Sequence, residues 1–595
     1  MAGGRFDKTI GKVLPGTYIN FESTRENEVI AAGTRGTAII PLPKANYGPA
    51  KKYIKLTTAS PDAQSAAFGY SIYDSDPNRQ MLLLREAFKR ATTVYAYILT
   101  EGKKASAEIE MQLPEPEESE VAAAVNAAVE QYLGVKEDLT GCTLNFDKAA
   151  RKLTMTLTGP ITGVKNTGLI DTLTALVGQG LTVALDGTTV TSTEDVMGTE
   201  LFTKLAGLEE GGEDVTFSIT VSKDDVEEAY TGCVSYPAAE SAGTQSVTPR
   251  VSGDTNTLTA VAKYGGSRGN DFTVTVDANP LGGYDVIIHL AGDKMAEYEG
   301  LYTIEELIAL DNPYLDFAGS GDLGEAVGTN LSGGDDSEVS NADITDFVDT
   351  WESVKFNTVA FPFDGEDATN VKQAAITKIK YMREDMGKGV QVVIPNAGAP
   401  DYEGVLNVTN SVALDNLELT TAEACAWVAG ATAGASMTES LTYVKYDGAT
   451  SVVNPKTNEE AVEAVKKGEF FFVVNEDEEI VAQYDINSLV TFSGQKDSSY
   501  RKNRVIRVFD TLQETIQLNF PPNKFDNEET GWNIMEGIGK SILRDFENQK
   551  AITNVDYDSD FKVDREASYD DMTYFDVGIQ AVDSAEKLYF TIHTR

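Results

Sequence analysis

Thr358-Val-Ala-Phe361 and Val390-Gln-Val-Val-Ile394 are short apolar runs on either side of a segment with helical periodicity, 369–386. Short runs rich in β-branched residues are typical of buried strands, and a helix between two strands allows them to run parallel. The alternation of helix and strand continues on both sides of this stretch. Residues 336–485 are therefore predicted to form an α/β domain with at least partly parallel strands. Its other predicted elements are helices at 342–351, 421–433 and 459–467 and a strand at 470–474.

Two amphipathic helices are predicted after this domain. Each shows an apolar stripe with i, i+3, i+4 spacing, which is typical of a helix that packs one face against a core. Strand-like residues follow at 574–582, so residues 486–585 are predicted to form an α+β domain. The two stripes are Val505, Val508, Leu512 and Ile516, and then Met535, Ile538, Ile542 and Phe546.

Both ends of the sequence look like strands that need a partner. The segment 586–595 alternates, with Leu588, Phe590 and Ile592 on one face and Tyr589, Thr591 and His593 on the other. The segment 1–30 contains a short extended stretch with Tyr18, Ile19 and Phe21. Terminal segments usually fray, so a strongly patterned one is expected to dock on a sheet edge. The pattern leaves open whether these arms pair within one subunit or between subunits.

The remaining sequence divides into a β-rich part and an insertion. Residues 31–105 and 251–335 are predicted to form one β-rich N-terminal domain. Between them, residues 106–250 carry 24 acidic and 8 basic residues and are flanked by linker-like stretches. This composition predicts an inserted domain that faces solvent.

Composition excludes several classes of protein. The net charge of −44 argues against direct binding of nucleic acid, which needs clustered Lys and Arg. The sequence has no long apolar run and no apolar signal core, so neither membrane insertion nor secretion is expected. Three cysteines in 595 residues do not suggest a disulfide framework.

Catalytic and metal-binding residues are not predicted. The sequence has only two histidines, His289 and His593, and neither neighbours a plausible nucleophile or ligand cluster. Gly319–Gly324 matches G-x-G-x-x-G but lacks the expected flanking strand and helix. Asp556–Asp560 resembles the start of a calcium loop, but Phe561 and Ala567 replace the required Gly and Glu. We expect no cofactor.

Basic residues cluster at two places in this acidic chain. They form either ion pairs within the chain or contacts with another subunit or partner. A basic helix start is unfavourable for the helix dipole, so acidic groups are expected nearby. The clusters are Arg501, Lys502, Arg504 and Arg507, and then Lys540 and Arg544.

Several segments together resemble the tail sheath proteins of contractile phage tails and related bacteriocin-like particles. Each motif is weak alone, but their order and spacing are specific. The similar segments are Lys12–Phe21, Ala262-Lys-Tyr-Gly-Gly-Ser-Arg-Gly-Asn-Asp271, Leu331-Ser-Gly-Gly-Asp335, Trp427–Gly434 with Glu439-Ser-Leu-Thr-Tyr443, Arg504–Asp510 and Asn523–Trp532.

The resemblance implies a structural role without catalysis. Its subtilisin-like domain, 336–485, contains no histidine and cannot hold a Ser-His-Asp triad. Subunits would form stacked hexameric rings around a tail tube protein, in contact with baseplate and tail terminator proteins. The arms would add strands to neighbouring subunits, and a metastable extended sheath would contract to drive the tube through the target envelope. The expected location is a virion tail assembled in the host bacterial cytoplasm.

Two other classes remain as alternatives at this point. A surface-layer protein also polymerises, although that class normally carries a secretion signal. A glycan hydrolase with paired carboxylates is less favoured, because such pairs are unavoidable among 93 acidic residues.

Overall fold

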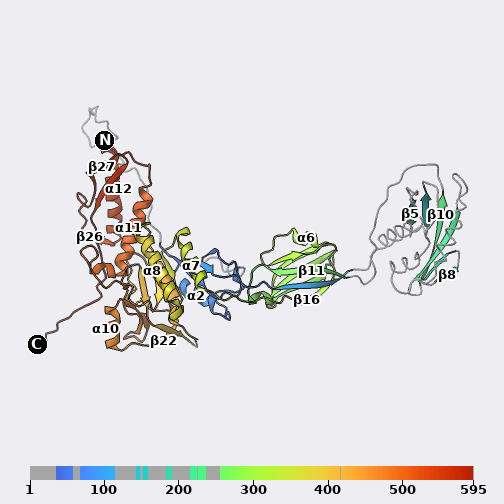
Figure 1. Cartoon of the computed structure of the whole chain (residues 1–595), viewed down its shortest axis with the longest axis horizontal. Helices are drawn as coiled ribbons and strands as arrows, with labels where there is room; N and C mark the ends of the chain where they lie inside the picture. The colour runs from blue at the N-terminus through green and yellow to red at the C-terminus, as the bar shows by residue number, and fades with distance from the viewer. Residues whose placement is uncertain are drawn as a thin grey trace, which may run out of the picture. The chain divides into compact units, whose positions relative to one another are not determined.

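The computed structural model describes residues 35–57, 67–113, 142–147, 152–157, 182–185, 188–190, 215–223, 226–235, 255–415 and 417–593. The chain divides into two compact units (Figure 1). The first unit contains residues 1–103, 264–268 and 335–595, and the second contains 104–263 and 269–334.

A seven-stranded sheet forms the centre of the first unit. Neighbouring strands run parallel except at one edge, where β2 runs antiparallel to β3. This arrangement, with helices between the parallel strands, confirms the predicted α/β fold class. The strand order is β2 (Tyr53–Thr57), β3 (Thr93–Ile98), β1 (Thr37–Leu42), β17 (Thr358–Ala360), β18 (Gln391–Pro395), β19 (Val405–Val408) and β23 (Glu469–Phe470).

Helices cover both faces of this sheet. Strand β1 shows why, because its residues are buried on both sides: Ala38 and Ile40 join one core, and Ile39 joins the other. Successive side chains of a strand point to opposite faces, so a strand buried on both faces needs a helical layer on each. The first core contains α2 (Gln80–Phe88) and α9 (Thr421–Gly434), and the second contains α7 (Asn341–Thr350) and α8 (Thr369–Glu384).

Two predicted domain boundaries differ from the structure. Residues 31–105 were grouped with 251–335, but β1 pairs in parallel with β17, placing Ala38 opposite Thr358. A parallel partner so distant in sequence leaves no local signal. The predicted insertion 106–250 begins too early, because β4 (Ser106–Gln112) pairs antiparallel with β11 (Thr255–Ala262).

Two fully antiparallel sheets of the second unit are formed by β4 and by strands β11 to β16. Alternate residues of β12 and β13, including Val274, Val276 and Ile288, are buried, as expected for sheets with one core-facing side. The segment Gly319–Gly324 joins two strands and opens no helix, which removes the dinucleotide-binding interpretation. The sheets are β15 (Leu315–Ala318), β11 and β4, and then β14 (Asp293–Leu301), β13 (Tyr284–Leu290), β12 (Phe272–Ala278) and β16 (Ala326–Asn330); α6 spans Ile304–Ile308.

A six-stranded sheet lies within the inserted sequence. Its strands pair antiparallel except for β10 and β6, which run parallel. The order is β5 (Cys142–Asp147), β6 (Lys152–Leu157), β10 (Val226–Ser235), β9 (Val215–Lys223), β7 (Thr182–Leu185) and β8 (Thr188–Val190).

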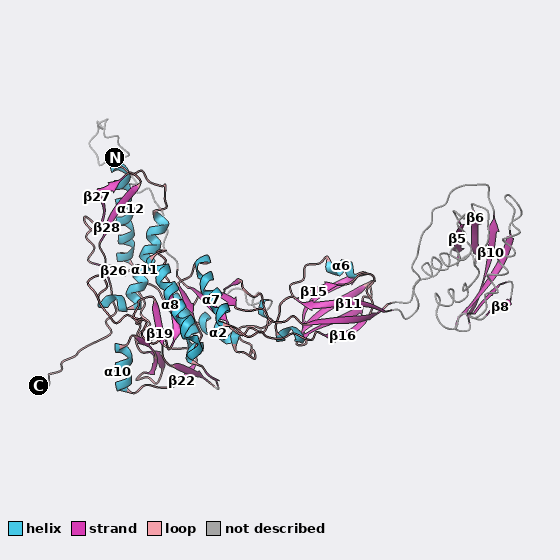
Figure 2. Ribbon diagram, in the orientation of Figure 1, coloured by secondary structure: helices cyan, strands magenta, loops and turns pink. Residues whose placement is uncertain are grey.

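The C-terminal part of the first unit has its own apolar core. The predicted stripes lie on two long helices, α11 (Asn503–Asn519) and α12 (Glu529–Asn548), shown in cyan in Figure 2. Val508 and Leu512 of α11 pack with Ile538, Ile542 and Phe546 of α12. The remaining strands form two-stranded sheets: β27 (Phe561–Tyr569) with β28 (Met572–Val577), and β26 (Ile552–Thr553) with β29 (Gln580–Ala581).

Smaller elements complete the first unit beside the main sheet. They are β20 (Ser411–Leu414), β21 (Leu417–Glu418), β22 (Ala449–Val453), α10 (Asn458–Lys466), β24 (Phe472–Val474), β25 (Ile480–Ala482) and the 3-10 helix η4 (Ser498–Arg501).

The motif Trp427–Gly434 has a packing function in α9. A Cβ added to Gly430 would lie 2.3 Å from the carbonyl oxygen of Ala87, and one added to Gly434 would lie 1.9 Å from that of Arg90. Real Cβ atoms do not approach backbone oxygens so closely, so these glycines allow α9 to lie directly against α2 and the residues that follow it. The glycines in this motif therefore set the distance between two helices.

Gly430→Ala is expected to lower the free energy of unfolding by about 1–3 kcal/mol, because the new methyl group must displace the backbone of α2. Gly537→Ala in α12 is the matched control, since its added Cβ would meet nothing within 4 Å. That control is expected to stabilise by about 0.5–1 kcal/mol, the difference in helix propensity. Urea denaturation of the isolated subunit measures both, and equal effects would contradict the packing interpretation.

Candidate functional site

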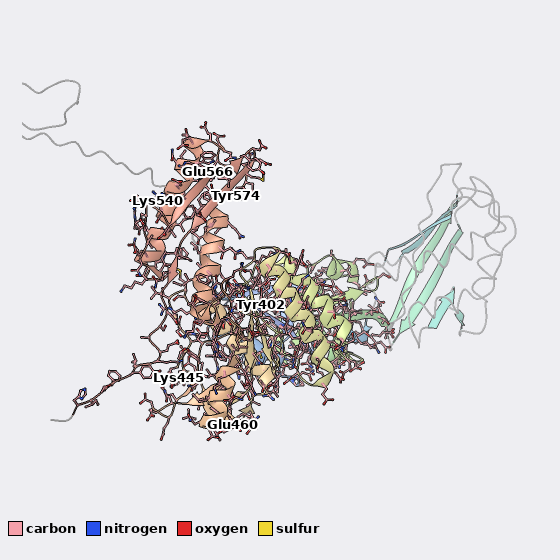
Figure 3. The ribbon with its side chains drawn as sticks, turned by 60° about the vertical axis from the view of Figure 1, so that its left-hand side comes forward. Tyr402, Lys445, Glu460, Lys540, Glu566 and Tyr574 are labelled. Atoms are coloured by element: carbon pink, nitrogen blue, oxygen red, sulfur yellow. The ribbon has the colours of Figure 1, made fainter. Side chains whose placement is uncertain are left out.

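The C-terminal segment leaves the first unit as an exposed, unpaired arm. In the part of the chain that the structure describes, its last backbone hydrogen bond to the body is donated by Val582 N to Ala551 O, at 2.9 Å. Beyond it, Leu588, Phe590 and Ile592 are 66%, 82% and 86% exposed. Figure 3 shows this extended trace with its side chains directed outward. We define residues 587–593 as the arm.

The predicted strand at the C-terminus does not form in the single chain. Residues 582–593 have no regular secondary structure, although their alternating pattern favours a strand. A strand needs a neighbouring edge for its backbone groups, and no strand of the described residues pairs with the arm. The corresponding N-terminal residues, Tyr18, Ile19 and Phe21, lie outside the described residues.

Glu586 holds the base of the arm against the body. One carboxylate oxygen accepts hydrogen bonds from Ser440 Oγ at 2.8 Å and Thr442 Oγ1 at 2.7 Å. The other oxygen pairs with the ammonium group of Lys502. The side chains of Glu586 and Lys502 are only 9% and 8% exposed, so this pair is largely shielded from water. We call these four residues the arm clamp.

The clamp residues come from separate parts of the sequence. Ser440 and Thr442 belong to the turn Glu439–Tyr443, which follows α9 and was part of the family resemblance. Lys502 directly precedes α11, the helix that carries the predicted basic cluster. The turn is held in place because Leu441 N donates to Asp485 Oδ2 at 3.0 Å and Tyr443 N donates to Ala482 O at 2.8 Å.

Arg507 and Asp485 form a fully buried ion pair beneath the clamp. Arg507 Nη2 lies 2.6 Å from Asp485 Oδ2, and both side chains have zero exposure. The same nitrogen donates to Glu439 O at 2.6 Å, and Asn503 Nδ2 donates to Asp485 Oδ1 at 3.0 Å. A buried charge is tolerated when it is paired and hydrogen-bonded, so this group fixes the start of α11 against the turn.

The other basic residues near the clamp also face groups of their own chain. Arg504 Nη1 donates to Ser584 Oγ at 2.6 Å, and Lys502 Nζ lies 3.8 Å from Asp583 and 4.3 Å from the Tyr484 ring centre. Burial lowers the pKa of Lys502, and the nearby carboxylates, first Asp583, partly oppose this shift. Burial likewise lowers the pKa of the half-buried Arg501.

The predicted basic contacts therefore fall into two groups. Lys502, Arg504 and Arg507 take part in an intrachain network, which is one of the two interpretations that the sequence left open. Arg507 has no surface to offer a partner in this conformation. Lys540 and Arg544 lie on α12, where Arg544 is exposed and its guanidinium lies 5.3 Å from the ring centre of Tyr557. Figure 3 places Lys540 in the same part of the C-terminal domain as Glu566 and Tyr574.

Two kinds of feature are absent from the described residues. Within the described residues, no group of three or more His, Cys, Asp or Glu side chains could hold a metal ion. The same residues include no helix with the length and apolar character needed to cross a bilayer. The clamp instead joins a fixed base to an exposed apolar segment.

Sequence reasoning missed four residues of this site: Glu586, Ser440, Thr442 and Asp485. A single Glu among exposed acidic residues has no distinguishing pattern, and its partners are more than 80 residues away. One signal was available. A basic helix start predicts nearby acidic groups, and Asp485 and Glu586 are those groups.

Arg507→Met is expected to lower the free energy of unfolding by about 3–5 kcal/mol, because it leaves the Asp485 carboxylate buried without its cation. Arg544→Met is the matched control on an exposed site, with an expected effect within about 0.5 kcal/mol. Chemical denaturation of the isolated subunit measures both changes. A small effect at Arg507, comparable to the control, would show that the buried pair does not fix α11.

Family models match three successive parts of the chain. The "Phage tail sheath protein beta-sandwich domain" matches residues 237–336, and the "Phage tail sheath protein central domain" matches 337–488. The "Phage tail sheath C-terminal domain" matches 495–595. These matches include strands β11 to β16 of the second unit, strands β17, β18, β19 and β23 of the seven-stranded sheet, and the helices and arm described above.

Individual proteins agree with this assignment. The chain is 33% identical to the phage-like element PBSX protein XkdK of Bacillus subtilis (strain 168), over 56% of this chain and 77% of that one. It is 28% identical to the uncharacterized protein YqbK of the same strain over the full length of both. The crystal structure of a sheath tail protein from Desulfitobacterium hafniense matches 97% of this chain and 99% of its own, with 26% identity and a TM-score of 0.62. The chain therefore belongs to the phage tail sheath protein family and is a structural subunit of a contractile tail sheath.

Proposed function

We propose that this subunit polymerises as stacked hexameric rings around a tail tube in a metastable extended state. Contraction of the sheath then drives the tube through the envelope of a target cell. The observation that carries this proposal is the arm, an exposed segment of alternating apolar residues held at its base by the clamp. Such a segment can gain backbone partners by adding a strand to the sheet edge of another chain.

The arm of one copy is proposed to add a strand to the C-terminal domain of a neighbouring copy. The described C-terminal domain contains only two-stranded sheets, β27–β28 and β26–β29. Sheets of two strands are marginally stable and leave outer edges with unpaired backbone groups. An added strand would satisfy those groups and connect two subunits without requiring either body to change shape.

A groove beside these sheets offers the arm a place for its apolar side chains. It has a volume of about 1000 Å³ and runs between α11 and residues 577–581. Leu512 and Ile516 of α11 and Ile579 opposite line it. The arm itself carries Leu588, Phe590 and Ile592, which supports the same occupant: the arm of a second copy.

The proposed partners follow from this role. They are further copies of the chain, a tail tube protein, and baseplate and tail terminator proteins. We propose that the subunit assembles in the bacterial cytoplasm, binds no nucleic acid directly and inserts into no membrane. An enzymatic role is not proposed, since the α/β domain 336–485 contains no histidine for a triad.

Replacing Leu588, Phe590 and Ile592 together with Ser should abolish sheath formation, because the docked strand would lose its apolar contacts. The subunit should remain folded, since all three side chains are exposed in the single chain. Negative-stain electron microscopy of polymerising protein, with circular dichroism as a folding check, measures the outcome.

The matched control for this experiment changes the opposite face of the same segment. Replacing Tyr589, Thr591 and His593 with Ser should reduce sheath length less than the first triple variant does. Deleting 587–595 should reproduce the full loss. Ordered contractile sheaths from the deletion variant would rule out the arm as the connection between subunits.

Lys540 and Arg544 are proposed to contact the tube or an adjacent subunit. They lie one helical turn apart on α12, and Arg544 is exposed. Lys540→Glu with Arg544→Glu should reduce co-sedimentation with assembled tubes by at least tenfold at low salt, because charge reversal replaces attraction by repulsion.

Lys466→Glu in α10 serves as the control for this reversal, since Lys466 is 65% exposed and lies outside both basic clusters. It should leave tube binding unchanged. Tube binding by the double variant at the wild-type level would make Lys540 and Arg544 ordinary surface charges.

A further inference from the structure

Residues 583–586 are attached to the body through side chains, unlike the segment before them. The segment before them is held by backbone hydrogen bonds: β29 pairs with β26, and Val582 N donates to Ala551 O. From Asp583 to Glu586, the described contacts with the body come from side chains, through Asp583 and Glu586 to Lys502 and through Ser584 to Arg504. This short segment can therefore detach without breaking a sheet.

Glu586 makes the strongest of these contacts. Its carboxylate accepts from two hydroxyl groups and pairs with an ammonium group, and both members of the pair are more than nine-tenths buried. Hydrogen bonds to a charged group are stronger than those between neutral groups. The Nζ of the next residue, Lys587, lies 5.8 Å from the ring centre of Tyr484.

We infer that the arm clamp sets the reach of the arm. With Glu586 bound, the free segment starts at Lys587. When Glu586 is released and the side-chain contacts of Asp583 and Ser584 also open, the free segment starts at Asp583 and gains four residues. An extended chain spans about 3.3 Å per residue, so opening adds up to ~13 Å of reach. Glu586 is thus a positioning residue for a connector, and this inference rests on the proposed function of the arm.

The clamp also favours the short reach in the free subunit. Opening it would separate the Lys502 ammonium group from the Glu586 and Asp583 carboxylates that pair with it. It would also break the two hydroxyl hydrogen bonds to Glu586, and hydrogen bonds to charged groups are the stronger kind, so a free subunit keeps the clamp closed. A mechanical load on a docked arm would act first on the contacts of residues 583–586, because the described contacts of this segment with the body are made by side chains alone. The short and long forms provide a connection that can lengthen without breaking.

The experiment measures distances between two spin labels on the full-length, unpolymerised subunit. One label replaces Tyr589 in the arm and the other replaces Lys466, an exposed position on α10. Unnatural amino acids carry the labels, so the native cysteines stay in place. Glu586→Gln removes the charge while keeping the size, and is expected to broaden the distance distribution and move its upper limit outward by up to ~13 Å.

Glu459→Gln, at an exposed position on α10, is the matched control and should leave the distribution unchanged. Ser440→Ala with Thr442→Ala gives a second test that keeps the ion pair and should produce a smaller broadening in the same direction. If Glu586→Gln does not fold, this double variant decides the matter. Unchanged distributions in the folded clamp variants would overturn the inference.

The distance measurement is independent of assembly, which separates it from the test of the arm itself. If the clamp inference is right and the arm is not the connector, Glu586→Gln will lengthen the reach while the deletion of 587–595 still assembles. If the arm connects subunits but the clamp does not set its reach, deletion will abolish sheaths while Glu586→Gln leaves the distances unchanged. If the clamp sets the reach and the arm connects subunits, sheaths of Glu586→Gln are expected to show irregular spacing between subunits.

Discussion

The buried Arg507–Asp485 ion pair is the constraint on which the functional end of this molecule depends. It joins the start of α11 to the loop after β25 and, through Glu439 O and Leu441 N, to the turn after α9. That turn supplies Ser440 and Thr442 to the clamp, and Lys502 lies one helical turn and a half before Arg507. If the pair were broken, Ser440, Thr442 and Lys502 would no longer be held in the positions that bind Glu586. Two fully buried side chains thus determine where the exposed arm begins.

A second ion pair joins α11 to the α/β layer. Arg383 of α8 binds both carboxylate oxygens of Asp510 in α11, at 2.8 and 3.1 Å, and both side chains are largely buried. The Asp510 carboxylate holds the pKa of Arg383 above its usual value, against the effect of burial, which comes first in size. A bidentate pair fixes orientation as well as distance. The helix that positions the arm is therefore oriented by the α/β layer of the same unit.

The sequence predicted those parts of the fold that have local periodicity. Two patterns were sufficient to predict helices and strands: the helix–strand alternation around 358–394 and the apolar stripes of α11 and α12. Both work because helix and strand periods are properties of neighbouring residues. It failed where partners are distant. No sequence pattern near Ala38 predicts its parallel partner at Thr358. None near Glu586 predicts its hydrogen bonds with Ser440 and Thr442. The arm is an instructive case, because its strand pattern stays a prediction: residues 582–593 form no strand, and no described strand pairs with them. The sequence identified the basic cluster, but only the contacts of the structure show that Lys502, Arg504 and Arg507 face groups of their own chain.

Electrostatics bears on the proposed connection by arms. Each copy carries a net charge of −44, so neighbouring copies repel one another at separations below the ~8–10 Å screening length of physiological salt. The arm sequence Lys587–Arg595 contains two basic residues and no acidic one, and its backbone and apolar contacts do not depend on charge. A weakly positive segment can therefore enter the field of a strongly negative neighbour at little cost, where two acidic bodies could not meet closely over a broad face. Under the proposed arrangement, repulsion between the bodies and attachment through the arms would let subunits stay connected while the distances between them change.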